Sequence, residues 1–140
     1  MRRVLTLLCL GVVSSCVASR LIAEGALQPV RCVLAARYES GSVASARAHD
    51  FIARNLIAPE MLEEGSFART FLASARFVGP GDGKIALAFT TDCDRAREFL
   101  VTRFEQLQAQ AEDAEVRNQL QTINGDWHPI TEGAAERVDW

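Results

Sequence analysis

A glycine-rich turn between two alternating apolar runs constrains the fold of this 140-residue chain more than any other feature. The runs cover residues 67–78 and 84–91, and apolar residues recur in them at every second position, interrupted in the first run by Arg69. Between them, positions 79–83 read G-P-G-D-G. Alternation with a period of two is typical of a strand with one buried face, and a short glycine-rich loop between two such runs predicts a β-hairpin.

A strand and a helix are predicted before this hairpin. Residues 30–38 alternate in the same way and predict a strand with one buried face. Ser42 is a favourable N-cap for a helix from residue 43 to about residue 58, which Pro59 ends because the residue before a proline disfavours helical dihedrals. A second short helix is expected from Pro59 to Glu64.

The region after the hairpin predicts a long amphipathic helix. Apolar residues at three- and four-residue spacings run from about Asp92 to Ile123, where Asn124-Gly125 provides a stop signal. A continuous helix of this extent would be about 45 Å long, which exceeds what so small a domain can cover. Two alternatives follow: the helix breaks near Asp113, or its far end protrudes.

The predicted order of elements is β-α-β-β-α, which indicates the α+β class. We expect a small antiparallel sheet with two main helices on one face, ferredoxin-like if a last strand forms near residues 137–140. The folded domain is predicted to cover residues 30–123, followed by a C-terminal tail at 124–140.

The amino terminus has the pattern of an export signal. Arg2 and Arg3 precede an apolar run of ten residues, Val4 to Val13. A signal peptide has an apolar region of this length, whereas a bilayer-spanning helix needs roughly 20 residues. Residues 1–15 are therefore predicted to direct export and to be removed.

The sequence Val13-Ser14-Ser15-Cys16 resembles the lipobox of bacterial lipoprotein precursors. The resemblance implies that Cys16 becomes the first residue and carries fatty acyl chains such as palmitate, so that residues 16–29 tether the domain to a membrane. Val17 stands where aspartate would imply retention at the inner membrane, so the outer membrane is favoured, with the domain facing the periplasm. Two alternatives stay open: export with cleavage near Ala18 and no lipid, or a retained leader with an incidental cysteine.

Two cysteines remain after the leader and the lipobox are set aside. Cys32 lies near the start of the first predicted strand, and Cys93 lies just past the end of the third, on the same parity as its buried residues. If those strands are antiparallel neighbours, the two cysteines meet, which predicts a disulfide in an exported protein. The alternative is a reactive thiol at Cys93, in the first turn of a helix.

His49 and His128 are the only histidines and are weak candidates for metal ligands. His49 and Asp50 are adjacent in a predicted helix, so their side chains diverge by about 100° and do not readily bind one ion. Both histidines are predicted to be surface or turn residues. The sequence contains no recognisable catalytic set, and no cofactor is expected.

The charge balance argues against nucleic acid as a partner. The chain has a formal charge of −3, and loss of Arg2 and Arg3 with the leader brings it to −5, without any basic cluster. The sequence therefore favours a lipid-anchored, non-catalytic accessory or adaptor protein that binds a protein partner in the cell envelope. The alternatives are a small-ligand or metal-binding periplasmic module, and an enzyme whose site the sequence does not reveal.

Overall fold

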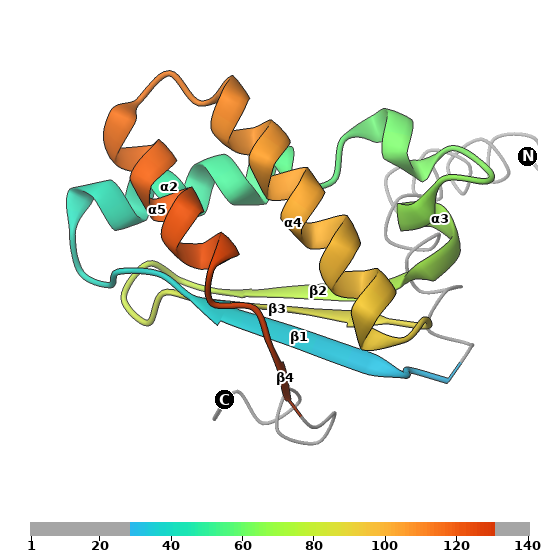
Figure 1. Ribbon diagram of the computed structural model, residues 1–140. Helices are drawn as coiled ribbons and strands as arrows, with labels where there is room; N and C mark the ends of the chain where they lie inside the picture. The colour runs from blue at the N-terminus through green and yellow to red at the C-terminus, as the bar shows by residue number, and fades with distance from the viewer. Residues whose placement is uncertain (1–28, 131–140) are drawn as a thin grey trace, which may run out of the picture.

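A computed structural model describes residues 29–130, in which all the helices lie on one face of a four-stranded sheet (Figure 1). The predicted leader, Cys16 and residues 131–140 lie outside the described residues, as does the strand expected near 137–140. The elements in chain order are β1 (Cys32–Arg37), α2 (Val43–Asn55), the 3-10 turn η1 (Pro59–Leu62), α3 (Phe67–Phe71), β2 (Leu72–Val78), β3 (Lys84–Phe89), α4 (Cys93–Gln110), α5 (Ala114–Asn124) and β4 (His128–Ile130).

The sheet is antiparallel throughout and has the strand order β2-β3-β1-β4. Together with the succession of strands and helices along the chain, this is the order of the ferredoxin-like split βαβ arrangement. The predicted α+β class, the hairpin at residues 79–83 and the location of the helices on one face are therefore confirmed.

The fourth strand is β4, which belongs to the segment predicted to be a tail. It pairs with β1 through Ile130 opposite Val33 and His128 opposite Ala35. The folded unit therefore extends beyond residue 123, at least to Ile130. The strand has only three residues and contains Pro129, which is tolerated because β4 lies at the edge of the sheet.

The predicted strand at 67–78 was wrong over its first five residues, which form the short helix α3. The Ser66 hydroxyl accepts a hydrogen bond from the Arg69 backbone N–H at 3.2 Å and caps this helix. Phe67 and Phe71 are four residues apart, a spacing that is compatible with a strand face and with one helical turn. The Phe67 ring stacks on Phe99 of α4, with 4.5 Å between centroids.

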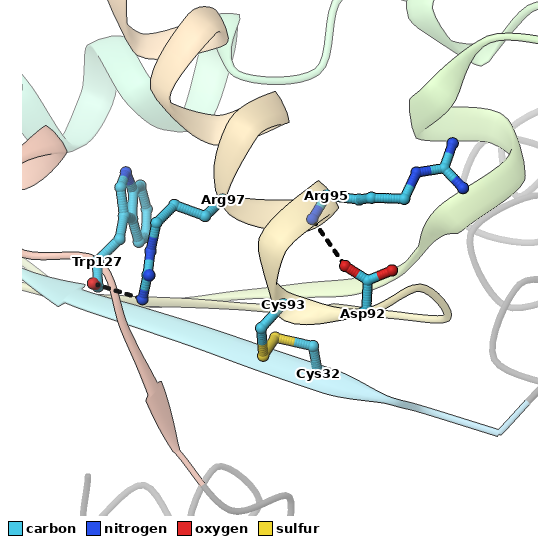
Figure 2. Close-up of a disulfide and its surroundings, with 6 residues drawn as sticks. All are labelled: Cys32, Asp92, Cys93, Arg95, Arg97 and Trp127. Carbon is cyan, nitrogen blue, oxygen red and sulfur yellow. Dashed lines mark hydrogen bonds between the residues drawn. A yellow bond between two sulfur atoms is a disulfide. The ribbon is translucent and has the colours of Figure 1, made fainter.

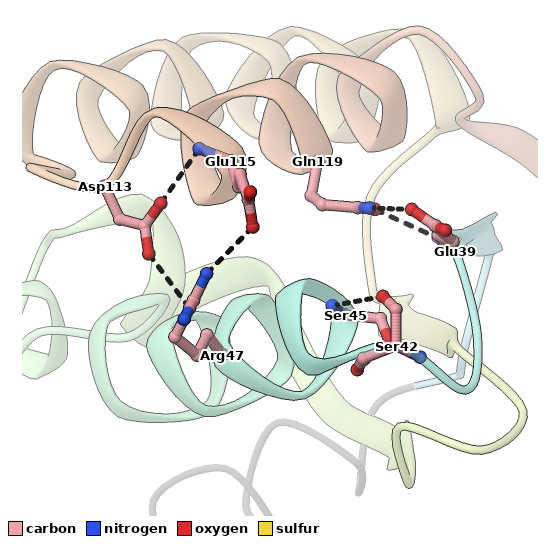
Figure 3. Close-up of polar contacts among 7 residues, drawn as sticks. All are labelled: Glu39, Ser42, Ser45, Arg47, Asp113, Glu115 and Gln119. Atoms are coloured by element: carbon pink, nitrogen blue, oxygen red, sulfur yellow. Dashed lines mark hydrogen bonds and ion pairs between the residues drawn. The ribbon is translucent and has the colours of Figure 1, made fainter.

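The long predicted helix breaks, so the first of the two alternatives is correct. Helix α4 ends at Gln110, and Asp113 caps α5 by accepting a hydrogen bond from the Glu115 N–H at 2.9 Å. Helix α5 turns back and packs against α2 and α4 (Figure 1). Arg47 of α2 forms ion pairs with Asp113 at 2.9 Å and Glu115 at 2.8 Å (Figure 3), so no helix end protrudes here.

The core lies between the sheet and the helices. Trp127 is 7% exposed and packs edge-on against Phe104, as expected for a tryptophan that covers apolar surface. The turn at 79–83 is held by Gly83, whose φ of +56° favours glycine and whose Cα approaches the Tyr38 carbonyl too closely for a Cβ. The largest fully buried side chains are Leu34, Ile52, Leu56, Leu72, Ile85, Leu87, Phe89, Leu100, Phe104, Leu107, Leu120 and Ile123.

Candidate functional site

The predicted disulfide between Cys32 and Cys93 is present, with 5.2 Å between the two Cα atoms (Figure 2). Cys32 pairs with Phe89 across the two central strands, and Cys93 follows Phe89 by four residues to begin α4. The start of β1 therefore meets the end of β3, as the residue parity predicted. Because the Cys93 sulfur is covalently bonded, the alternative of a reactive thiol does not apply to this state of the protein.

The residues around the disulfide hold the start of α4. Asp92 is the N-cap, and the hydrogen bond from the Arg95 N–H at 2.9 Å lowers the pKa of the Asp92 carboxyl (Figure 2). Arg97 donates to the Trp127 carbonyl oxygen at 3.4 Å, which connects this helix to the segment before β4. These contacts stabilise the start of α4 against the sheet, and Cys32 is only 4% exposed.

His49 is half-buried and packs against the helix side of the sheet. Its Nδ1 lies 2.6 Å from the Tyr38 hydroxyl oxygen, and that hydroxyl is 3.2 Å from the Val78 carbonyl oxygen. Burial raises the pKa of Tyr38 to about 12, so the phenol is neutral at physiological pH. His49 therefore differs from the predicted surface histidine, because it joins α2 to the end of β1.

His128 is exposed and lies on the opposite face of the sheet from His49. It pairs with Ala35 across β4 and β1, and its Nδ1 is 2.7 Å from the Asp126 carbonyl oxygen. The sheet separates the two histidines, so they cannot share an ion. Within residues 29–130 no three His, Cys, Asp or Glu side chains gather closely enough to hold a metal.

An open cavity of about 540 Å³ lies between α4 and the segment that contains η1 and α3. Arg95 lies at one wall with its guanidinium 4.7 Å from the centre of the Phe71 ring. This cavity was not predicted, because it forms only when residues far apart in sequence meet. The lining residues are Glu60, Met61, Phe67, Arg95, Glu98, Phe99, Thr102, Arg103 and Gln106.

Arg103 in the wall of this cavity serves the structure. It is 8% exposed, and its guanidinium donates to the carbonyl oxygens of Leu56, at 2.9 Å, and Asn55, and to the Gln106 side chain at 3.0 Å. Burial lowers the pKa of Arg103, which the charge of Glu60 opposes. The carbonyl groups at the end of α2 have no hydrogen-bond donor within the helix, and the Arg103 guanidinium donates the hydrogen bonds that they lack.

The remaining groups of the cavity combine hydrogen-bond donors with an aromatic wall. Arg95 and Thr102 offer hydrogen-bond donors, while Phe67 and Phe99 offer an aromatic wall. No cysteine, histidine, serine or lysine lines the cavity; its one hydroxyl is that of Thr102, and its carboxylates are those of Glu60 and Glu98. Outside the cavity, the Asp92 and Asp113 carboxylates cap helices α4 and α5.

Comparisons with models of protein families, with curated proteins and with solved structures find no match to this chain. No helix between residues 29 and 130 is both long enough and apolar enough to cross a bilayer.

Proposed function

We propose that this protein is an exported lipoprotein, anchored through acylated Cys16 to the outer membrane, whose domain faces the periplasm as a non-catalytic accessory or adaptor. The single observation that carries the proposal is the disulfide between Cys32 and Cys93. Disulfides form and persist in oxidising compartments such as the bacterial periplasm. The leader at 1–15 and the lipobox that ends at Cys16 point to the same compartment.

The position of the tether supports a membrane-proximal domain. Pro29 is the first described residue and lies three positions before Cys32, so the chain enters the fold at the disulfide corner. The residues from Cys16 to Gln28 number 13 and span at most about 45 Å when fully extended. The tether therefore joins the domain at the disulfide corner, at the opposite end of β3 from the turn at residues 79–83.

A non-catalytic role is supported by what the reactive side chains do in the fold. The two cysteines are bonded to each other, His49 contacts Tyr38, and Arg103 binds backbone carbonyls. The proposed partner is a protein of the cell envelope. Since α5 folds back on the domain, no helix between residues 29 and 130 projects toward a partner, and the proposed binding region is a surface of the folded body.

Intact mass of the protein isolated from membranes tests the anchor and the disulfide together. We expect a chain that begins at Cys16 with the added mass of its acyl chains, and a further increase from alkylation of two thiols only after reduction. A Cys16→Ala variant is the matched control and should carry no acyl mass, whereas the wild type carries this mass and enters the detergent phase of a detergent phase separation. A wild-type protein that keeps its first fifteen residues, or stays aqueous, would contradict the proposal.

The cavity favours a second candidate function, a small-ligand-binding module. Its volume of about 540 Å³ lies within the usual range of roughly 300–1,000 Å³ for ligand pockets. The stacked rings of Phe67 and Phe99 beside Arg95 suit a small aromatic carboxylate. A series of such acids should raise the thermal midpoint of the wild type but not of Arg95→Gln, with exposed Arg54→Gln as the matched control; absence of any shift would count against this function.

A further inference from the structure

The face of the sheet that points away from the helices, here called the outer face, contains an apolar cluster. Val33 and Ala35 of β1 and Ala86 of β3 are 4%, 2% and 4% exposed, although all the described helices cover the other face (Figure 1). Val30, Val78, Ala88 and Ile130 pack around them. A solvent-facing sheet surface leaves such side chains accessible, so their burial indicates that a further layer covers them.

The outer face is also basic, although the sequence shows no basic cluster, because strand pairing brings scattered cations together. Arg31 immediately precedes β1 and Arg37 ends it, and alternation along the chain places both beside the apolar cluster. Lys84 pairs with Arg37 and Arg76 pairs with Ala86, so these two cations lie on the same face. His128 faces outward opposite Ala35. None of the outward-facing strand positions within the described part of the chain is an aspartate or glutamate. In a protein with a net charge of −3, this concentration of cations points to an acidic occupant.

The ten residues that follow β4 have the matching chemistry. The sequence T-E-G-A-A-E-R-V-D-W at 131–140 has three carboxylates, Glu132, Glu136 and Asp139, against the one cation Arg137. It also contains Val138 and Trp140, which can cover apolar surface. An acidic segment with apolar residues thus follows directly after the strand that borders the basic and apolar outer face.

The segment starts in the right place and is long enough. Ile130 faces outward beside Val33, so the chain leaves β4 at the rim of the apolar cluster. The four strands of the sheet span about 14 Å from the axis of β4 to that of β2, since neighbouring strands are about 4.8 Å apart. Ten extended residues reach up to about 33 Å, which is more than twice this width.

We propose that residues 131–140 bind in cis to the outer face and form a third layer, with their carboxylates against Arg31, Arg37, Arg76 and Lys84. The two layers of apolar side chains, one on each side of the sheet, then explain why five of the six residues of β1 and four of the six residues of β3 are buried. The outer face is accordingly closed to other partners while the segment is bound. This inference does not depend on acylation of Cys16.

Tryptic cleavage after Arg137 tests the proposal in the purified full-length mature protein. Docking protects this bond, so neutralising the segment with Glu132→Gln, Glu136→Gln and Asp139→Asn should speed cleavage about tenfold, because cleavage follows the undocked population. Raising the salt concentration should also speed cleavage after Arg137 in the wild type, because salt screens the attraction between the segment and the outer face. The matched control neutralises three exposed carboxylates of the helical layer, Glu63, Glu64 and Glu105, and should leave the rate of cleavage after Arg137 unchanged.

A second measurement reports from the outer face itself. Lys84 is the only lysine of the chain, so an amine-reactive label at this position is read directly from the mass of its peptide. Ending the chain at Ile130 should increase the labelling rate of Lys84 severalfold. The proposal is overturned if trypsin cleaves after Arg137 equally fast in the wild type and in the neutralised variant. It is also overturned if protection disappears on dilution, which would indicate a second copy of the chain. Finally, it is overturned if removal of residues 17–28 exposes Lys84 while removal of residues 131–140 does not.

Discussion

Removing the disulfide should destabilise the domain strongly. The loss in the free energy of unfolding can be worked out from the length of the loop that the disulfide closes. The bond connects residues 61 positions apart. In the chain-entropy model, closing a loop of this length in the unfolded chain contributes about 4 kcal/mol to the free energy of unfolding. A domain of this size loses about 3–6 °C of its thermal midpoint per kcal/mol, so we expect a decrease of about 12–24 °C.

The perturbation is the double variant Cys32→Ala/Cys93→Ala, and the assay is thermal and urea unfolding followed by circular dichroism. The native spectrum should be retained, because the bond acts mainly on the unfolded chain, and the urea m-value should rise as that chain expands. Reductant should lower the thermal midpoint of the wild type by a similar amount. It should leave the midpoint of the double variant unchanged, so the variant is the control for other effects of the reductant. A decrease of less than about 3 °C in the reduced wild type would refute the entropic reasoning.

Three further predictions concern single side chains and the turn. In the folded protein the pKa of Tyr38 is raised to about 12 from an ordinary value near 10, so the unfolded chain releases this proton first. The free energy of unfolding, measured by urea titration at each pH, should therefore fall as the pH rises from about 10 to about 12. Tyr38→Phe should not show this fall. Arg103→Met should cost about 2–3 kcal/mol in urea unfolding, because the carbonyls at the end of α2 lose a charged donor, whereas exposed Arg54→Met should stay within about 0.5 kcal/mol. Gly83→Ala should lower the free energy of unfolding by more than about 1 kcal/mol, because residue 83 has a positive φ and a Cβ there clashes with the Tyr38 carbonyl. Gly81→Ala should be nearly neutral, because a Cβ at residue 81 meets no atom within 4 Å. Equal effects of the two substitutions would contradict this account of the turn.

The parts of the fold that the sequence predicted are those with an unambiguous local period. Strand β1 and the hairpin of β2 and β3 were predicted because their side chains alternate and G-P-G-D-G permits only a turn. The same parity argument located the disulfide, since an antiparallel register fixes which strand ends meet.

The parts that were missed depend on contacts that local patterns do not contain. Helix α3 was read as strand because Phe67 and Phe71 satisfy both periods, and the N-cap Ser66 together with the stacking of Phe67 on Phe99 stabilises the helix. Strand β4 has three residues and a proline, so it has no period of its own and forms by pairing with β1. The cavity beside α4 arises from residues 60–67 meeting residues 95–106, a proximity that no spacing in the sequence encodes.

The disulfide also determines how the domain would respond to mechanical load. Only three described residues, from Pro29 to Arg31, precede Cys32. A pull from the amino-terminal side therefore reaches Cys32 almost at once and crosses the covalent bridge to Cys93. The intervening residues, which include α2, β2 and β3, are bypassed and experience no direct tension. Under such stretching, the load extends only the segments after Cys93, and the central hairpin bears no tension until the bridge is reduced.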